Sequence, residues 1–334
     1  MQPSDCPISP GAGRTEPLLA VADLLVSFPR AGGLRPVVAG ISWSLQAGRT
    51  LGVVGESGCG KSVSALALMG LVPSPGRVAG SIRFAGRELL GQSRAAWRAL
   101  RGADIAMVFQ EPMTALNPVM PVGRQIAEAL VLHRKGMGWQ EAGQEAVSLL
   151  DAVGIGAPRL RARAYPHHLS GGMRQRAVIA MALACAPRLL IADEPTTALD
   201  VTIQAQILDL MQDLQDRTGM AIQFISHNLA VVSEIAHDII VMYAGRIVER
   251  ATAGALFEQP LHPYTQGLIA TLPDPGHRVA RLPVIPGGVA EPDAGGGCPF
   301  ADRCPRADAA CRAAEPAPVE IAPGHVVACF KAAA

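Results

Sequence analysis

The chain has 334 residues, of which 49% are hydrophobic and 17% charged, as in an ordinary globular protein. This length exceeds the usual size of one hydrophobic core, so we expect a main domain of about 250 residues with an appendage. The 29 basic residues nearly balance the 28 acidic residues, and the formal net charge is +1. That balance excludes a global field that would attract nucleic acid or anionic lipid, and we expect no nucleic-acid partner.

Residues 1–17 are rich in Pro, Ser and Gly and predict a flexible arm. The arm holds no apolar run typical of a signal peptide, so the chain is expected to stay in the cytosol, where disulfides are disfavoured. The longest unbroken apolar run, Ala177–Ala186, is about half of the roughly 20 residues that a membrane-spanning helix needs. It predicts a buried helix, and no membrane span is expected.

The apolar patterns predict an α/β core. Residues 18–28 and 41–55 alternate like short strands, and from Leu51 the pattern becomes buried strand, glycine loop and helix. The short apolar runs "LLIAD" at 189–193 and "AIQFIS" at 221–226 are typical of a parallel sheet covered on both faces.

The chain divides into three predicted parts: the arm at 1–17, a main domain at 18–252 and an extension at 253–334. Residues from about 97 to 187 carry apolar residues at helical spacing, so they predict a helical subdomain set into the core. The last 82 residues hold 12 of the 27 prolines, which predicts an add-on with little regular structure.

A phosphate-binding motif follows the strand that starts at Leu51. "GESGCGKS", Gly55–Ser62, fits G-x-x-x-x-G-K-[ST] between a strand and a helix. Glycines allow backbone N–H groups to surround phosphate oxygens, Lys61 reaches the terminal phosphates, and Ser62 ligates Mg²⁺. The residues expected to contact the nucleotide here are Gly55, Glu56, Ser57, Gly58, Cys59, Gly60, Lys61, Ser62 and Val63.

A second motif, "LLIADEP", ends a buried strand with two carboxylates. Asp193 is placed to bind the metal, while Glu194 points elsewhere and is able to polarise a water for attack on the γ-phosphate. An apolar run followed by Asp-Glu becomes strong evidence only because it follows a phosphate loop.

From Leu169 the sequence "LSGGMRQRAVIAMALACAP" resembles the signature motif of ATP-binding cassette (ABC) ATPases. The other motifs of that family follow in the expected order. They are Phe28 as the aromatic that stacks on adenine, Gln110 of the Q-loop in "VFQEP", Asp200 of the D-loop in "TALD" and the switch histidine His227 in "ISHN".

The resemblance implies an ABC-type P-loop ATPase with a RecA-like core, an antiparallel β subdomain and an inserted α-helical subdomain. Ser170, Gly171 and Gly172 open an apolar helix, so a hydroxyl, backbone amides and the helix dipole point at one spot that suits an anion. In this family two ATPase subunits pair head to tail, and the signature of one closes over the γ-phosphate held by the other.

Residue roles carried over from the family describe an active ATPase. Lys61 and Ser62 hold phosphate and Mg²⁺, and Asp193 anchors the Mg²⁺. Gln110 senses the metal and the attacking water. Glu194 is the general base, and His227 contacts the γ-phosphate. One departure is that Ser226 and Asn228 flank the histidine where threonine and aspartate are commoner.

Among ABC ATPases, the sequence favours a transporter subunit. Only 107 residues separate Ser62 from Ser170, without the sustained heptads of the DNA-organising members, and the chain holds one cassette. The expected partners are two transmembrane permease subunits, a second ATPase subunit, identical or different, and indirectly an extracytoplasmic solute-binding protein. The groove for the permeases is expected around 111–122. A non-transport ATPase is the competing class.

The tail resembles the C-terminal extension of oligopeptide and dipeptide importer ATPases. "LFEQPLHPYTQGLI", 256–269, contains its hallmark His262, Pro263 and Tyr264, and "CPFADRCPRADAAC" follows. The expected function is ATP-driven import of di- or oligopeptides at the cytoplasmic face of the plasma membrane. Nickel or other small-solute importers share much of this sequence and are the alternative.

Four of the seven cysteines lie in the last 37 residues, at Cys298, Cys304, Cys311 and Cys329. The paired C-x2-C knuckles common at structural zinc sites are absent, and four thiolates are the normal complement of an iron–sulfur cluster, which some members of the importer family carry. The expectation is a structural [4Fe-4S] cluster, with Zn²⁺ or metal-free packed thiols as the alternatives. Cys6 and Cys185 are expected to be unrelated.

Overall fold

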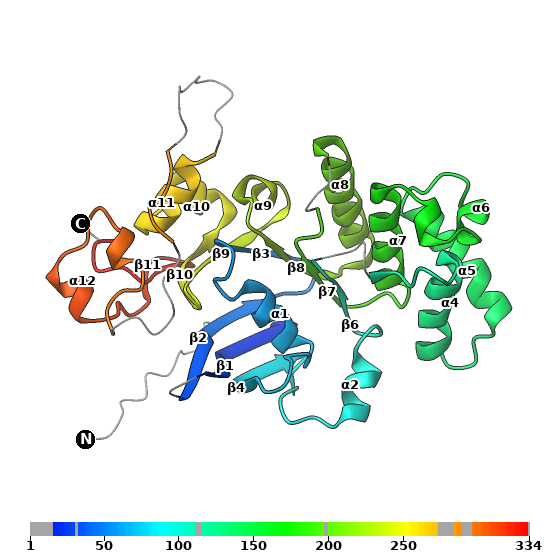
Figure 1. Cartoon of the computed structure of the whole chain (residues 1–334), viewed down its shortest axis with the longest axis horizontal. Coiled ribbons are helices and arrows are strands. Elements are labelled where there is room, and N and C mark those ends of the chain that lie inside the picture. The colour runs from blue at the N-terminus through cyan, green and yellow to red at the C-terminus, as the bar shows by residue number, and fades with distance from the viewer. Residues whose placement is uncertain are drawn as a thin grey trace.

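The structure is a computed structural model that describes residues 16–30, 33–110, 115–196, 200–272, 283–288 and 296–332. Two sheets, a group of helices and the C-terminal extension make up this part of the chain (Figure 1). Most of the predicted arm and Cys6 lie outside the described residues. The predicted domain boundaries stay a prediction.

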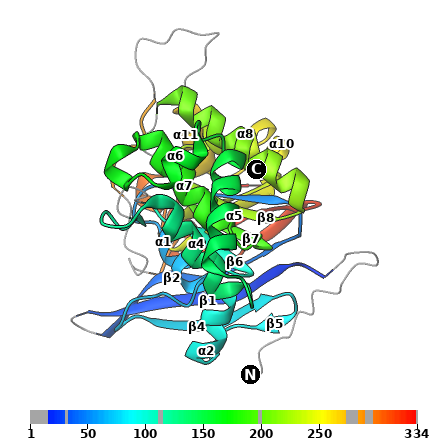
Figure 2. The ribbon, with the colours of Figure 1, turned by 90° about the vertical axis from the view of Figure 1, so that its right-hand side faces the viewer.

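The smaller sheet has four antiparallel strands in the order β2-β1-β4-β5 and forms a layer under the larger sheet (Figure 2). On β2, the side chains of Ile41, Trp43 and Leu45 are buried while their neighbours are exposed, which is the period of a half-covered sheet. The predicted antiparallel pairing is confirmed. The strands are β1 (Leu19–Arg30), β2 (Gly33–Leu45), β4 (Arg77–Phe84) and β5 (Arg87–Glu88).

The larger sheet has eight strands in the order β11-β12-β10-β9-β3-β8-β7-β6. The run from β9 to β6 is parallel, and β3, β7 and β8 are buried along their whole length, as predicted from their apolar sequences. The strands are β3 (Thr50–Val54), β6 (Ile105–Val108), β7 (Leu189–Asp193), β8 (Ala221–Ser226), β9 (Asp238–Tyr243), β10 (Arg246–Thr252), β11 (Val319–Ala322) and β12 (His325–Val327).

Helices cover both faces of the larger sheet. Helix α1 lies between the two sheets, while α8 and α9 lie on the opposite face, and α4 to α7 form a group beside the β6 edge (Figure 1). β6 lies inside the range expected to be helical. The helices are α1 (Lys61–Leu68), α2 (Arg94–Leu100), α4 (Val122–His133), α5 (Trp139–Ala152), α6 (Pro158–Ala162), the 3₁₀ turn η1 (Pro166–His168), α7 (Gly171–Leu183), α8 (Val201–Thr218) and α9 (Leu229–Ile235).

The C-terminal extension is more regular than predicted. Its strand β12 pairs with β10 and β11 pairs with β12, so the extension continues the main sheet. The expectation of an irregular add-on was wrong because β10 leaves a row of backbone donors and acceptors that a later strand satisfies. Its other elements are α10 (Ala253–Glu258), α11 (Pro263–Ala270), the 3₁₀ turn η2 (Ala301–Arg303) and α12 (Ala309–Ala313).

A buried carboxylate ties the extension to the main sheet. Glu249 on β10 accepts hydrogen bonds from the backbone N–H groups of Leu261 at 2.8 Å and His262 at 2.9 Å. Its Oε1 also lies 2.8 Å from Nε2 of His325 on β12. A buried charge needs such partners, so the position of Glu249 fixes both segments of the extension.

Among the described helices, none is long and apolar enough to cross a lipid bilayer.

Candidate functional site

The glycine-rich loop connects the end of β3 to the start of α1. Gly55 and Gly60 have φ values of 154° and 102°. A Cβ on Gly55 would lie 2.2 Å from the carbonyl oxygen of Met242, so only glycine fits this approach of two backbones. Gly60 caps α1 without a side-chain hydrogen bond, so the start of that helix offers backbone amides to a ligand.

Lys61 folds back onto the loop. Its side chain is buried, and Nζ donates to the carbonyl oxygens of Gly55 at 2.7 Å and Glu56 at 3.0 Å, with the sulfur of Cys59 at 3.8 Å. These contacts satisfy the ammonium group inside the protein. Lys61 therefore contacts the loop for which phosphate binding is predicted, and its contact with phosphate stays a prediction.

Ser62 and Asp193 meet as the motifs predict. Oγ of Ser62 donates to Oδ1 of Asp193 at 3.1 Å, and Asp193 is buried at the end of β7. Burial raises the pKa of this carboxyl above its ordinary value, and the charge of Glu194 raises it further, against lowering by the bond from Ser62 and by Lys61. A hydroxyl next to a carboxylate is a suitable donor set for Mg²⁺.

Glu194 follows Asp193 with a left-handed backbone, φ 48°, an uncommon conformation for a residue with a side chain. Its Oε2 lies 3.1 Å from Nδ1 of His227, within hydrogen-bonding distance. The side chain of His227 is 57% exposed and that of Glu194 is 10% exposed. The histidine is thus open to a ligand while it contacts the carboxylate.

The structure places the signature helix α7 apart from the phosphate loop. Helix α7, which begins at the signature, lies in the helical group, whereas α1 lies under the centre of the sheet (Figure 1). Ser170 caps α7 by accepting from the N–H of Met173, and Asp200 caps α8 by accepting from the N–H of Ile203. One copy of the chain therefore does not close its own signature over its own phosphate loop.

Two further residues, Phe28 and Gln110, were predicted to contact the nucleotide. Phe28 is half-buried near the end of β1, and Gln110 is exposed two residues after β6 ends. The residues that follow, 111–114, lie outside the described part of the chain. The roles of Phe28 and Gln110 stay predictions.

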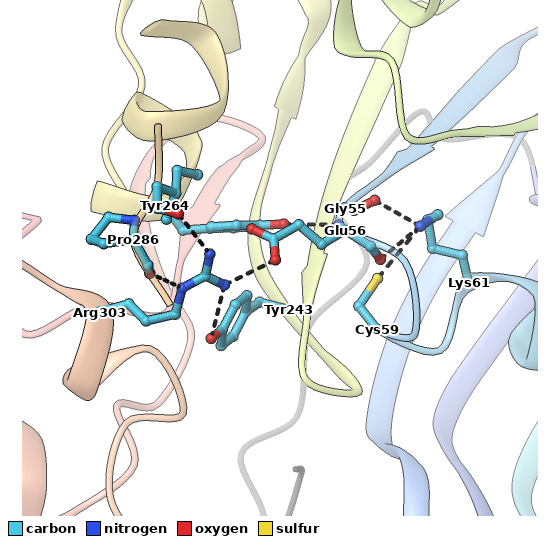
Figure 3. A network of polar contacts seen from close by, with 9 residues as sticks. Gly55, Glu56, Cys59, Lys61, Tyr243, Tyr264, Pro286 and Arg303 are labelled. Atoms are coloured by element: carbon cyan, nitrogen blue, oxygen red, sulfur yellow. Dashed lines mark hydrogen bonds and ion pairs between the residues drawn. The ribbon is translucent and has the colours of Figure 1, made fainter. Parts of the chain in front are cut away.

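Two residues of the extension contact the phosphate loop, and these contacts were not predicted from the sequence. The phenol oxygen of Tyr264 accepts the N–H of Glu56 at 2.9 Å, and Nη1 of Arg303 donates to Oε2 of Glu56 at 2.9 Å (Figure 3). Tyr264 was singled out only as a family hallmark. No sequence pattern signals a polar contact between residues 208 or 247 positions apart.

The four C-terminal cysteines lie near one another without forming a metal site. The N–H of Cys298 donates to the carbonyl of Cys311 at 2.7 Å, and burial raises the pKa of the Cys298 thiol, helped by its three neighbouring thiols. Among the residues that the structure describes, no three His, Cys, Asp or Glu side chains are arranged to hold a metal ion. The predicted cluster, or zinc, is therefore not supported by this geometry.

Comparison with known proteins identifies two family matches and relatives that cover most of the chain. The family model described as "ABC transporter" matches residues 38–197, and that of the "Oligopeptide/dipeptide transporter, C-terminal region" matches 248–311. The probable peptide ABC transporter ATP-binding protein y4tR of Sinorhizobium fredii is 52% identical over 320 residues, 94% of this chain and 95% of the relative. The chain belongs to the ABC transporter family of ATP-binding proteins.

Two further comparisons agree with this membership. The dipeptide transport ATP-binding protein DppD of Escherichia coli is 50% identical over 93% of this chain and 96% of its own length. The dimeric post-hydrolysis structure of the cassette MJ0796 shares the fold, with a TM-score of 0.64 at 22% identity over 70% of this chain and 98% of that one. The chain is thus an ATP-binding ATPase subunit, and its ABC fold is confirmed.

Because the carboxyl of Asp193 is buried, we expect its replacement by an uncharged side chain to stabilise the folded protein. Asp193→Asn removes a charge that burial disfavours, so unfolding without nucleotide or metal should require on the order of 1 kcal/mol more at neutral pH. The folded pKa lies above the ordinary 3.8, so the folded state holds the proton more tightly and the charge weakens stability as pH rises.

The measurement is urea unfolding of the wild type and Asp193→Asn at several pH values. The difference in free energy of unfolding between the two proteins should shrink as pH falls toward 3.8, where the carboxyl of Asp193 in the folded wild type is itself protonated. Asp209→Asn on the exposed face of α8 is the matched control and should change little. A loss of stability at neutral pH would contradict this account of Asp193.

Proposed function

We propose that this chain is the ATP-hydrolysing subunit of an importer for di- or oligopeptides, peripheral on the cytoplasmic face of the plasma membrane. The observation that carries the proposal is similarity of about 50% identity over nearly the whole chain to ATP-binding proteins named for peptide transport. The match to the oligopeptide/dipeptide transporter C-terminal region supports it independently of the nucleotide site.

The proposed chemistry assigns a role to each group at the ends of the parallel strands. The loop at 55–63 and Lys61 bind the phosphates of ATP, and Ser62, Asp193 and Gln110 hold Mg²⁺, which supplies charge neutralisation when bound. Glu194 accepts a proton from the water whose oxygen attacks the γ-phosphorus as the bond to the β-phosphate oxygen breaks. The contact between Glu194 and His227 supports this part of the proposal.

A second ATPase subunit completes the proposed site. The phosphate loop and the signature at Ser170 to Gly172 lie in different parts of one copy (Figure 1). In a head-to-tail pair, the start of α7 from one subunit would face the γ-phosphate held by the other, where its amides and dipole favour an anion. Val201, beside Asp200, is 81% exposed and would be covered by such pairing.

A groove in the helical group is the proposed docking place for the permease subunits. It has a volume of about 1090 Å³ and lies between α4, α5 and α6. Its lining includes Pro121, which belongs to the range 111–122 expected for this contact. Trp139 on its wall is 52% exposed, and Arg124 lies over the indole ring at 5.6 Å. An exposed tryptophan with neighbouring arginines suits a helical segment from another protein.

Peptide uptake tests the proposed function. In cells that lack this chain, uptake of a labelled dipeptide or oligopeptide should be restored by the wild type and not by Lys61→Ala, which removes the phosphate-binding ammonium. Lys135→Ala changes an exposed lysine after α4 and is the matched control. Wild-type protein should also bring down hydrophobic membrane chains from detergent extracts. If those chains are recovered but peptide uptake is unchanged in cells that lack this protein, the proposal is refuted.

The role of Glu194 has its own test in the assembled transporter. Glu194→Gln should lower ATP turnover by about 10²- to 10⁴-fold, the usual effect of losing a general base, while ATP-bound dimers persist in size-exclusion chromatography. Glu234→Gln, on the exposed side of α9, should leave turnover unchanged. Turnover of Glu194→Gln at the wild-type rate would mean that another group is the base.

We further propose that the four C-terminal cysteines hold a structural [4Fe-4S] cluster, with Zn²⁺ as the alternative. The number of thiols supports the proposal, and so does their closeness, since Cys304, Cys311 and Cys329 each act on the thiol of Cys298. Protein purified anaerobically should be coloured and contain about four iron atoms per chain, and Cys298→Ser should lose them. Cys185→Ser is the control, and a colourless zinc-loaded wild type would overturn the cluster.

A further inference from the structure

Glu56, the second residue of the phosphate loop, is held by three different groups. Its N–H donates to the phenol oxygen of Tyr264 at 2.9 Å, and its Oε2 accepts from Nη1 of Arg303 at 2.9 Å. Its carbonyl oxygen accepts from Nζ of Lys61 at 3.0 Å. Two of these groups come from the C-terminal extension, and the third is the lysine that binds phosphate (Figure 3).

Arg303 is itself fixed in place. Its side chain is 7% exposed, and Nε donates to the carbonyl of Pro286 at 2.7 Å. The guanidinium lies over the rings of Tyr243 and Phe300, at 5.7 and 5.9 Å from their centres. Nη2 donates to the carbonyl of Ile285 at 3.3 Å and Nη1 to the hydroxyl of Tyr243 at 3.4 Å. These contacts hold the guanidinium where Nη1 also reaches Glu56.

Tyr264 is equally fixed. It is fully buried at the start of α11, and its ring packs edge-on against Tyr243 at the end of β9, with centres 4.8 Å apart. Its N–H donates to Nδ1 of His262 at 3.0 Å. Burial lowers the pKa of His262 to about 3, so the imidazole is neutral and able to accept this bond.

We propose that Arg303 and Tyr264 are positioning residues for ATP, and that the C-terminal extension sets the shape of the phosphate loop through them. Arg303 neutralises the carboxylate of Glu56, which would otherwise repel a triphosphate. Tyr264 fixes the main chain of Glu56. Arg303 lies in the segment between Cys298 and Cys304, so a disturbance of that segment weakens nucleotide binding. The inference rests on the proposed nucleotide site at 55–62.

If Arg303 acts by neutralising Glu56, removing the charge of Glu56 should compensate for the loss of Arg303, which a purely structural role would not predict. Arg303→Met leaves the charge of Glu56 unpaired beside the phosphates, so the Kd for a fluorescent ATP analogue with Mg²⁺ should rise about tenfold. Adding Glu56→Gln to Arg303→Met removes that charge and should recover most of the affinity. Tyr264→Phe deletes only the acceptor of the Glu56 N–H and should raise Kd about threefold.

The matched control is Arg306→Met in the same extension. Arg306 is exposed, and its Nη2 lies 3.5 Å from the carbonyl oxygen of Leu261 and 3.5 Å from Oε1 of Gln266. Burial is the larger cause of the low pKa of His262, so the loss of Arg306 should leave that imidazole neutral and should not change Kd. Thermal unfolding of each full-length variant shows whether it folds. If Arg303→Met does not fold, Arg303→Lys serves in its place, since lysine keeps the charge without the fork and should bind ATP between the two extremes.

The outcomes separate this inference from the proposed function. A folded Arg303→Met with wild-type Kd, or a double variant that binds no better than Arg303→Met, would overturn the positioning role while the nucleotide site stands. A wild-type chain that binds no ATP analogue would instead refute the nucleotide site itself. Weakened binding by Arg303→Met, recovery on adding Glu56→Gln and an unchanged Arg306→Met support the inference.

Discussion

The parallel pairing of β3, β8 and β7 is the constraint on which the candidate site depends. Val54 on β3 pairs with Ser226 on β8, and Asp193 on β7 pairs with Ile225, so the three strands end at one edge of the sheet. The phosphate loop follows β3, His227 follows β8, and the two carboxylates are the last residue of β7 and the residue after it. Residues that lie far apart in the sequence therefore meet because the backbone register brings their strands to the same edge.

Most of this site was predictable because its signals are local. A glycine loop ending in Lys-Ser after an apolar strand, and an apolar run ending in Asp-Glu, each describe a strand and the groups at its end within a few residues. The contact between Ser62 and Asp193 was expected, since both residues were predicted to bind the same Mg²⁺. The contact between Glu194 and His227 was not predicted from the sequence. Alternation predicted the strands of the smaller sheet, while their antiparallel arrangement was implied by the family resemblance.

The extension was harder to predict because its order comes from distant partners. Frequent prolines suggested irregular chain, yet Pro263 begins α11, where proline is tolerated, and the carboxylate of Glu249 organises segments that the sequence does not mark as neighbours. The sequence shows how many thiols the extension holds and how far apart they lie along the chain. It does not show their arrangement in space, because spacing alone does not fix the loops between them. Long-range polar contacts have no periodic signature.

The distance along the chain between Glu56 and Arg303 has a consequence for biosynthesis. The phosphate loop is translated first, and 247 residues must follow before its ion-pair partner exists. At about 5–20 residues per second this takes about 10 to 50 s. A nascent chain on the ribosome therefore carries a phosphate loop that lacks its anchor, and a prematurely ended product would never acquire it.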